Sequence, residues 1–356
     1  MTRIYLIRHA EAEGNLYRIA QGQANSNLTD RGWRQVRALE RRFADVHIDA
    51  VYASDLYRTC ATSSAIYKPK GLPLYRTQAL REICVGVWEQ RSWGEIYCRW
   101  PEEMEHFSYR PDLWRLEGAE EPRAARARVL AELRAIAGRH PGQTVAAFSH
   151  GYVLRMVLSH LQGIPLARLG ETPTGGNTAV SLLEVEGDRM RVVFRDDNSH
   201  LKTPEFLAGE RAPRRANALE PGLWFAPVQP EQAETARVLA ETACGRADDG
   251  GLCAAGSPGR DTLIGYLNEK PVGLVSVKSA SGHIEMLCVH PDYRRRGYGI
   301  QLLGQAVQRT RAAGGQRVTT ETPAEEAKSF WEDCGFHPGP EGYEKEIRFL
   351  PEFLSE

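Results

Sequence analysis

The chain contains no apolar stretch long enough to span a lipid bilayer, and its short apolar N-terminal run soon meets charged residues, unlike a signal peptide. It also lacks an excess of charge of either sign, since 45 basic side chains face 46 acidic ones. This balance excludes an overall electrostatic attraction to nucleic acid or to an anionic membrane. The seven cysteines are odd in number and form no C-x-x-C pair, which argues against a disulfide framework and a structural zinc site. We therefore expect a cytoplasmic protein without nucleic-acid or membrane partners.

The length of 356 residues favours two domains. In the N-terminal part, short apolar strands alternate with amphipathic helices, which is typical of an α/β domain with a mostly parallel sheet. Thr29 or Asp30 is expected to cap a helix, and Ser54 and Asp55 to open another. The predicted elements are strands at 4–7, 49–53 and 143–148, a helix that follows the Thr29 or Asp30 cap and includes Trp33 to Phe43, helices from Pro122 onward and at 150–161, and a hairpin over 178–194.

The pattern breaks in a segment rich in Pro, Gly and Arg, which predicts a linker at residues 205–221. We accordingly predict one domain over residues 1–204 and a second over residues 222–350. The second domain is expected to contain helices at 231–242 and 299–312 and strands at 262–267, 272–278, 283–289 and 317–321.

Cationic and titratable residues follow the predicted strands of the first domain. Arg8 and His9 come after the first strand, Arg58 lies at the start of the helix after the second, and His150 follows the third. Glu82 lies in a loop between them. Ligands of α/β sheets bind at the carboxyl ends of the strands, and the amides of the helix opening at Gly151 favour an anion. This grouping predicts a site for a phosphate ester.

The segment Leu6-Ile7-Arg8-His9-Ala10-Glu11 resembles the Arg-His-Gly-Glu signature of the histidine phosphatase (phosphoglycerate mutase-like) superfamily. Ala10 departs from the usual Gly, and we expect the loop to accommodate its small side chain. The resemblance implies a three-layer α/β domain and hydrolysis of a small phosphorylated metabolite through phospho-His9, with no metal. It continues in family order through residues 11–15, 28–32, 54–59, 80–83 and 149–151.

The same resemblance implies a role for each residue. His9 is the nucleophile, and neighbouring guanidinium groups favour its neutral form. Arg8 and Arg58 bind the phosphoryl oxygens, and Glu82 protonates the leaving alkoxide and then takes a proton from water. His150 is expected to donate a hydrogen bond to the transferring oxygens. The predicted substrate-binding residues are Asn15, Gln21, Gly22 and Gly151.

Two alternatives to a phosphatase stay open at this stage. A mutase would return the phosphoryl group to substrate, but family mutases carry a Trp where Gly14 stands and a longer insertion before the second histidine. An inert scaffold would not need the complete set of Arg8, His9, Arg58, Glu82 and His150. The aromatic residues between Glu82 and Glu120 could stack on a substrate, but packing within a small helical cap is favoured.

The second domain carries a different motif between a strand and a helix. The arrangement R-x-x-G-x-G at residues 294–299 resembles the pyrophosphate loop of GNAT-type N-acetyltransferases, and residues 330–336 resemble a later segment of that family. The resemblance implies an α+β domain that binds acetyl-CoA and transfers acetyl to a small amine. The expected acetyl-CoA-binding residues are Leu287, Cys288, Val289, Arg294, Arg295, Arg296, Gly297, Tyr298 and Gly299.

The acetyl-transfer machinery is less complete. Trp331 stands where the family often has a Tyr that protonates the thiolate, and Cys334 or Tyr343 are possible substitutes. His283 or Glu285 could accept the amine proton. An alternative interpretation is a non-catalytic acyl-CoA sensor that regulates the phosphatase.

Overall fold

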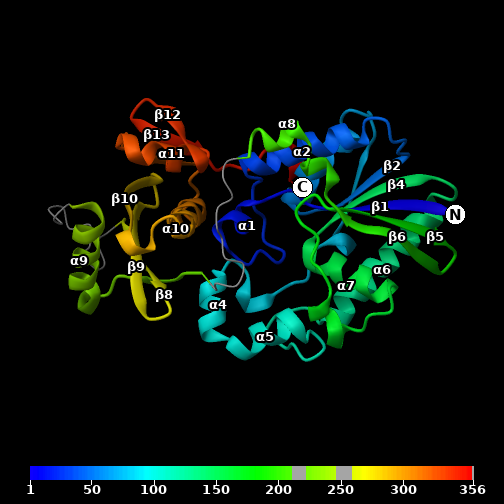
Figure 1. Ribbon diagram of the computed structural model, residues 1–356, viewed down its shortest axis with the longest axis horizontal. Helices are drawn as coiled ribbons and strands as arrows, with labels where there is room; N and C mark the ends of the chain where they lie inside the picture. The colour runs from blue at the N-terminus through cyan, green and yellow to red at the C-terminus, as the bar shows by residue number, and fades with distance from the viewer. Residues whose placement is uncertain (211–221, 246–258, 355–356) are drawn as a thin grey trace.

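The computed structural model describes residues 1–210, 222–245 and 259–354 (Figure 1). It contains two β-sheets, which lie on either side of the predicted linker 205–221 in the sequence. Residues 211–221 of that segment lie outside the described residues, and its beginning belongs to a short helix, α8 (Pro204–Leu207). We call the parts built on the two sheets the N-terminal and C-terminal domains. Their limits at residues 204 and 222 stay predictions.

The sheet of the N-terminal domain has the strand order β3-β2-β4-β1-β5-β6. Strands β1 to β4 are parallel, whereas β5 is antiparallel to both β1 and β6. The mostly parallel sheet and the predicted hairpin are therefore confirmed. The strands are β1 (Thr2–Arg8), β2 (Ala50–Ser54), β3 (Leu74–Thr77), β4 (Thr144–Ser149), β5 (Val180–Glu186) and β6 (Arg189–Asp197).

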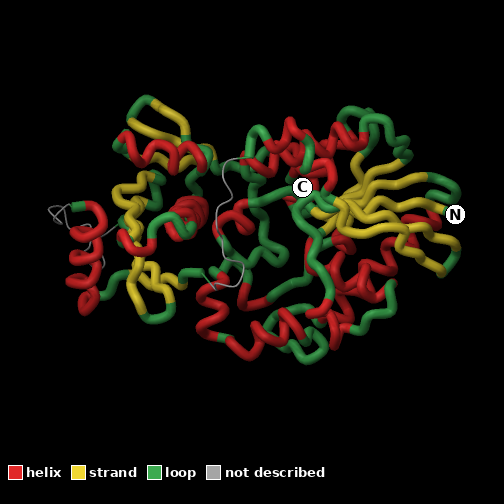
Figure 2. Tube along the Cα trace, viewed as in Figure 1, coloured by secondary structure: helices red, strands yellow, loops and turns green. Residues whose placement is uncertain are grey.

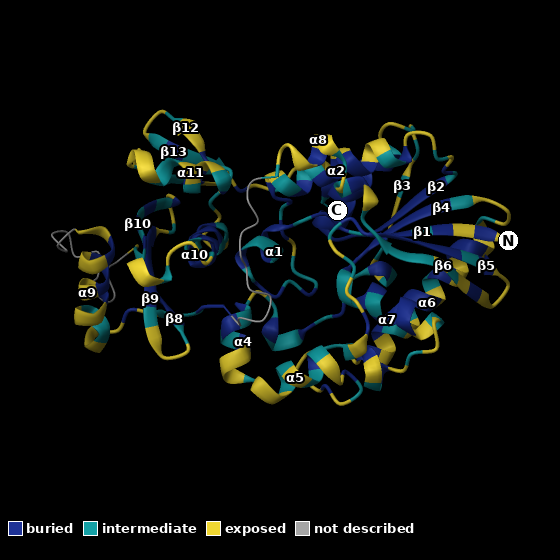
Figure 3. Ribbon diagram, viewed as in Figure 1, coloured by how far each residue is buried: buried dark blue, intermediate teal, exposed yellow. Residues whose placement is uncertain are grey.

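Helices cover both faces of this sheet (Figure 2). α2 (Asp30–Phe43) and α3 (Tyr57–Tyr67) pack on one face, and α6 (Pro122–Arg139) and α7 (Gly151–Leu161) on the other. In β1, Ile7 packs with the first pair of helices, whereas Ile4 and Leu6 pack with the second. Alternate side chains of a strand point to opposite faces, so a strand covered on both faces is apolar throughout. Figure 3 shows the sheet as the buried centre of a three-layer domain.

The predicted helix starts are confirmed in two cases and wrong in a third. Thr29 caps α2, because its Oγ1 accepts a hydrogen bond from the Gly32 amide at 3.0 Å, and α6 begins at Pro122. The prediction that Ser54 and Asp55 open α3 is wrong, since Ser54 belongs to β2 and the helix begins at Tyr57. The Asp55 carboxylate instead binds Arg81, with 2.5 Å between Nη2 and Oδ2.

The C-terminal domain has a mixed sheet with the order β12-β13-β11-β10-β9-β8-β7. β10 and β11 are parallel, and the other pairs are antiparallel. α9 (Ala233–Cys244) packs on one face of the sheet, and α10 (Tyr298–Ala312) and α11 (Glu325–Asp333) on the other. The α+β class is confirmed. The strands are β7 (Trp224–Pro227), β8 (Asp261–Leu267), β9 (Lys270–Lys278), β10 (His283–Val289), β11 (Arg317–Thr320), β12 (His337–Gly339) and β13 (Gly342–Glu346).

Several short elements were not predicted, among them α1 (Glu13–Tyr17), α4 (Trp93–Arg99) and α5 (Pro101–Tyr109). Short segments show too few turns or alternations for hydrophobic periodicity to identify them. α1 lies against α10, and the C-terminus returns to the N-terminal domain (Figure 1). Among the helices of the described part of the chain, none is both long and apolar enough to cross a membrane.

Candidate active site

The two candidate histidines follow neighbouring strands of the N-terminal sheet. His9 comes directly after β1 and His150 directly after β4, and these strands are parallel with Arg8 paired to Ser149. The pairing places the two imidazole rings with centroids 5.3 Å apart. Arg58 lies at the start of α3, which follows β2, the other neighbour of β4. One edge of the sheet thus assembles residues that are far apart in the sequence.

The imidazole of His9 is oriented by a single strong contact. Its Nδ1 lies 2.7 Å from the Ala10 carbonyl oxygen, an acceptor, so Nδ1 carries the proton and Nε2 keeps a free lone pair. Burial, together with the nearby charges of Arg58 and Arg8, holds the pKa of His9 well below its usual value. His9 is therefore neutral at physiological pH, with the lone pair of its imidazole at Nε2. Ala10 has no positive φ, so the departure from Gly is accommodated as expected.

Two arginines lie beside this ring and are held by backbone carbonyls. Arg58 is buried and donates to the carbonyls of Ala24 and Gly22, each at 2.8 Å. Burial lowers its pKa to about 10, which leaves it protonated at neutral pH. Arg8 donates to the Gly175 carbonyl at 2.5 Å, while its Nε is buried and has no hydrogen-bond partner within the described residues. An unpaired buried guanidinium donor beside a neutral imidazole suits an anionic oxygen of a ligand.

His150 has both ring nitrogens engaged by protein groups. Its Nδ1 accepts from Arg58 Nε at 3.2 Å, so its Nε2 carries the proton and donates to Ser54 Oγ at 2.9 Å. Burial and the charge of Arg58 hold the pKa of His150 well below its usual value. In this arrangement His150 orients Arg58, and its expected donation to the phosphoryl oxygens stays a prediction.

The Glu82 carboxylate lies at the N-terminus of α7. Its Oε1 accepts from the amides of Ile83 at 3.0 Å and Val153 at 2.9 Å, and its Oε2 accepts from the Tyr152 amide at 2.9 Å. The N-terminal amides of α7, which were expected to favour an anion, therefore bind the Glu82 carboxylate. Arg128 fixes the loop by donating to the Glu82 carbonyl at 2.9 Å. These contacts hold the carboxylate at a fixed position.

The predicted substrate-binding residues have the following contacts. Asn15 Oδ1 accepts from the Ala12 amide at 3.0 Å, which orients the Asn15 amide nitrogen away from that contact. Gly22 has φ of +48°, a conformation that suits glycine, and it supplies the carbonyl for Arg58. At Gly151, an added Cβ would lie 2.9 Å from Arg8 Nε, so the glycine leaves room for that guanidinium. Gln21 packs against Gly14, where a Cβ would lie 2.2 Å from its Cγ.

Sequence reasoning missed a loop that holds His9 from the opposite side. Asn177 Nδ2 donates to the His9 carbonyl at 3.1 Å, and the Thr178 amide donates to the same oxygen at 3.3 Å. Thr178 has φ of +57°, which is unusual for a β-branched residue, and its Oγ1 lies 3.0 Å from Nε2 of buried His200. Such strain persists where surrounding contacts impose it. Nothing in the run Gly175 to Thr178 of the sequence signals this role.

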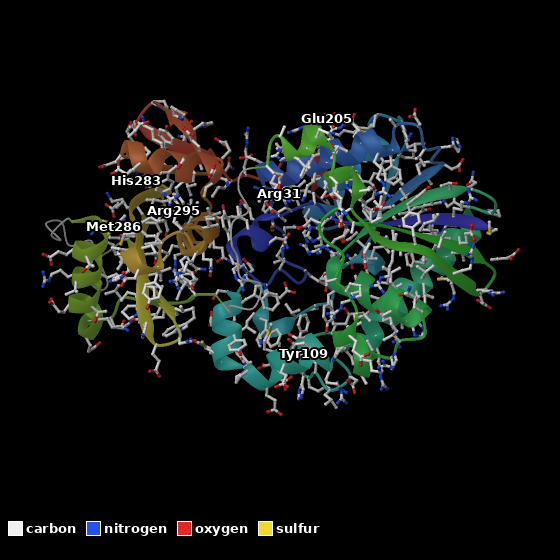
Figure 4. The ribbon with its side chains drawn as sticks, in the orientation of Figure 1. Arg31, Tyr109, Glu205, His283, Met286 and Arg295 are labelled. Atoms are coloured by element: carbon white, nitrogen blue, oxygen red, sulfur yellow. The ribbon has the colours of Figure 1, made fainter. Side chains whose placement is uncertain are left out.

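The aromatic residues between Glu82 and Glu120 form the core of a cap. Trp88, Phe107 and Trp114 are buried and pack in mutual contact, with ring centroids between 5.0 and 5.6 Å apart. Tyr152 of α7 stacks on Phe107 at 4.2 Å. Tyr109, labelled in Figure 4, is exposed. The packing interpretation is therefore supported for the three buried rings.

In the C-terminal domain, β10 and β11 pair at His283 and Ile284 and then separate, where a bulge in β10 interrupts its pairing with β9. The predicted loop follows β10. Arg294 donates to the carbonyls of Val289 at 3.1 Å and Ala243 at 2.6 Å. Gly297 has φ of +86°, and an added Cβ there would meet no atom within 4 Å among the described residues. The first-turn amides of α10 have no acceptor within the helix, so the loop fits a phosphate-bearing ligand.

The predicted base candidates lie on β10 (Figure 4 labels His283). Glu285 binds Arg260 at 2.5 Å and Lys278 at 2.9 Å. Although burial opposes ionisation, these hydrogen bonds hold the pKa of Glu285 below its usual value, which disfavours a role as proton acceptor. His283 Nδ1 lies 3.1 Å from Thr319 Oγ1. The assignment of a base at either residue stays a prediction.

Trp331 is buried in the core of the C-terminal domain, with ring centroids 5.3 Å from Phe330 and 4.8 Å from Phe336. Cys334 is buried in the same core, and Tyr343 donates to Glu332 Oε1 at 3.3 Å. No contact identifies a substitute for the missing tyrosine within the described residues.

Comparison with known proteins agrees with both motifs. Residues 4–198 match the histidine phosphatase superfamily (branch 1), and residues 255–352 match the acetyltransferase (GNAT) domain. Phosphoserine phosphatase 1 of Hydrogenobacter thermophilus is 28% identical over 201 residues, which are 56% of this chain and 95% of that protein.

A probable phosphoglycerate mutase GpmB of Yersinia pestis is 32% identical over 176 residues, 46% of this chain and 77% of the relative. Among solved structures, YhfR of Bacillus stearothermophilus is similar with a TM-score of 0.55 and 32% identity, covering 56% of this chain and all of that one. The similar proteins include both phosphatases and mutases by name.

Proposed function

The chain belongs to the histidine phosphatase superfamily, and from this premise we propose that it hydrolyses small phosphomonoesters through a phosphorylated His9, without a metal ion. The observation that carries the proposal is the neutral His9, with Nδ1 bound to the Ala10 carbonyl and Nε2 free beside two arginines. A phosphomonoester brings two negative charges, which Arg8 and Arg58 would offset in a buried setting.

In the first step, His9 Nε2 forms a bond to phosphorus as the ester P–O bond breaks. Arg8 Nε and the remaining Arg58 donors stabilise the equatorial oxygens. Glu82 takes up a proton on binding of the ester, although three amides donate to its carboxylate, and passes that proton to the departing alkoxide. In the second step water attacks phosphorus, the Nε2–P bond breaks, and Glu82 takes the proton of that water. The Asn177 and Thr178 contacts to the His9 carbonyl keep the ring aligned throughout.

The identity of residue 14 favours hydrolysis over mutase activity, since family mutases carry a Trp where Gly14 stands. A Cβ at this position would lie 2.2 Å from Gln21 Cγ, so the Trp that family mutases carry here would not fit without moving Gln21. The similarity to proteins named phosphoglycerate mutase keeps transfer to a second substrate hydroxyl as the alternative.

The C-terminal part of the chain is a GNAT acetyltransferase domain, for which we propose acetyl-CoA-dependent transfer to a small amine. Bound acetyl-CoA would supply an activated acetyl thioester. The amides of the loop from Arg294 to Gly299 would hold its pyrophosphate, and Gly297 leaves open space for it. The buried Trp331 and the ion-paired Glu285 favour the sensor alternative more than the sequence did. An acetylation assay with a panel of small amines distinguishes an acetyltransferase from a sensor, because a sensor would bind acetyl-CoA without transferring its acetyl group.

Quenching with alkaline detergent during turnover of radiolabelled phosphate esters tests the phosphatase proposal. We expect an acid-labile, base-stable phosphoenzyme in the wild type, unaffected by a chelator, and none in His9→Ala. Glu82→Gln should lower turnover about a hundredfold or more, a usual contribution of general acid–base catalysis. His47→Ala, at an exposed histidine, is the matched control and should behave as wild type. Undiminished hydrolysis by His9→Ala would refute the assignment.

A further inference from the structure

Part of the phosphatase signature segment is packed into the acetyltransferase domain. Tyr17, the last residue of α1, is 2% exposed and belongs to the same apolar core as Leu303 and Val307 of α10. A Cβ at Gly304 of α10 would lie 2.5 Å from the Tyr17 Cβ, so only a glycine permits this approach. Figure 1 shows α1 beside α10.

Polar groups of the acetyltransferase domain bind both ends of α1. Arg311 Nη2 lies 3.0 Å from Oε2 of Glu13, a carboxylate that is only 4% exposed. Arg311 also donates to the Ile347 carbonyl at 2.8 Å. Lys345 donates to the Tyr17 hydroxyl at 3.3 Å and to the Cys334 carbonyl at 2.7 Å. The arginine and the lysine therefore each connect their own domain to α1.

These contacts matter for phosphate binding because of what α1 carries. Asn15 lies between Glu13 and Tyr17, and the segment continues to Gly22, whose carbonyl binds Arg58. α1 has five residues, and a helix of that length has little stability of its own. Its position must come from its surroundings. Glu13 further accepts from the Asn27 amide at 3.3 Å, which ties the returning segment to the same carboxylate.

We propose that Arg311 and Lys345 of the acetyltransferase domain are positioning residues of the phosphatase, which hold α1 so that Asn15 and Gly22 stay aligned with Arg58. Loss of the Arg311 charge leaves a buried Glu13 carboxylate without its cationic partner, and α1 shifts toward solvent to hydrate it. The phosphatase site is therefore incomplete without the second domain. The inference rests on the proposed phosphohistidine chemistry.

Steady-state hydrolysis of a phosphate ester by full-length Arg311→Gln tests the inference. We expect kcat/KM to fall by about ten- to a hundredfold with a raised KM, as expected when binding groups are misplaced by a fraction of an ångström. Arg309→Gln is the matched control, because Arg309 lies on the same helix and pairs with Asp261 of its own domain at 3.3 Å. It should match wild-type kinetics. Arg311→Lys, which keeps the charge, should recover part of the loss.

Two further measurements separate positioning from a general loss of folding. The burst amplitude of phosphoenzyme counts competent molecules, so a purely structural role would lower the amplitude and leave KM unchanged. The double variant Glu13→Gln with Arg311→Gln removes the unpaired charge and should be more active than Arg311→Gln alone. If Arg311→Gln fails to fold, the KM values of Arg311→Lys and Lys345→Met are compared with that of Arg309→Gln instead.

If the wild type forms phosphoenzyme but Arg311→Gln has the same KM and kcat as Arg309→Gln, the positioning role is refuted and the phosphohistidine proposal stands. A wild type that forms no phosphoenzyme overturns the phosphohistidine proposal and this inference with it.

Discussion

The two sites of this chain differ in how their ligand-binding groups are held. In the phosphatase site the functional side chains bind one another or the nearby backbone, as Arg58 does with His150 and Gly22, and His9, Arg58 and His150 are buried. In the acetyltransferase loop, Arg294, Arg295 and Arg296 are exposed, and the groups suited to a ligand are backbone amides. The first site depends on residue identity, and the second depends on backbone conformation.

This difference explains why the sequence identifies the functional residues of the first site more completely than those of the second. A buried network of side chains restricts each member to a few residue types, so the types themselves reveal the chemistry. A loop that binds through amides needs glycines at particular φ values and leaves the other side chains free. The binding role of such a loop can be recognised from its glycines. The glycines do not indicate which residues transfer protons.

Gly151→Ala should break the buried site. The added Cβ would lie 2.9 Å from Arg8 Nε, and Arg8 is held on its other side by the Gly175 carbonyl. We expect kcat/KM for phosphate esters to fall by about a hundredfold, since small misplacements of binding groups have effects of that size. Gly138→Ala is the control, because its Cβ would meet nothing within 4 Å in the described structure. Full activity of folded Gly151→Ala would contradict the crowding of Arg8.

The buried histidines should make the N-terminal domain sensitive to acid. Burial and the charge of Arg42 lower the pKa of His200 to about 4, below its usual value near 6.5. A depressed histidine pKa means that the unfolded chain binds the proton more readily, so stability is complete above pH 6.5 and declines as the pH falls toward 4. For His200 the full difference is about 3 kcal/mol, and His9 and His150 shift in the same direction.

Urea unfolding between pH 7 and pH 5, followed by tryptophan fluorescence, measures this decline. His200→Gln should give a flatter dependence of the free energy of unfolding on pH than wild type does. His47→Gln, which removes an exposed histidine paired with Asp49, is the comparison variant and should change the slope less than His200→Gln does. A slope that is the same in all three proteins would assign the acid sensitivity to other groups.

Much of the fold and most of the first site could be predicted from the sequence. The long strands and helices show clear periodicity, and His9, Arg58 and His150 follow strands that turn out to be neighbours. Asn177 and Thr178 could not be found, because they act through an amide and a strained backbone rather than through a motif.

The contact between the domains could not be predicted from the sequence either. Tyr17 and Gly304 are far apart in the sequence, and no local pattern marks either as part of an interface. Glu285 was a reasonable base candidate by strand position, but its partners Arg260 and Lys278 lie on other strands or next to them. Ion pairing between distant segments depends on register, which a single sequence does not reveal.

Gly297→Val tests the open site, where a smaller effect is expected than at Gly151. The new Cβ meets no described atom of the protein within 4 Å, so we expect the harm to come from strain at φ of +86° and from the space a pyrophosphate would occupy. Gly314→Val separates these causes, since Gly314 has φ of +84°, equally open surroundings and a position beyond the other end of α10. Both variants carry the same backbone strain, and only Gly297 lies in the proposed binding loop.

Calorimetric titration should show acetyl-CoA binding weakened about tenfold by Gly297→Val and unchanged by Gly314→Val. Phosphatase activity should be kept in both variants, because neither substitution reaches α1 or His9. Equal affinities in the two variants would place the ligand elsewhere and leave the Arg294 to Gly299 segment as a basic turn.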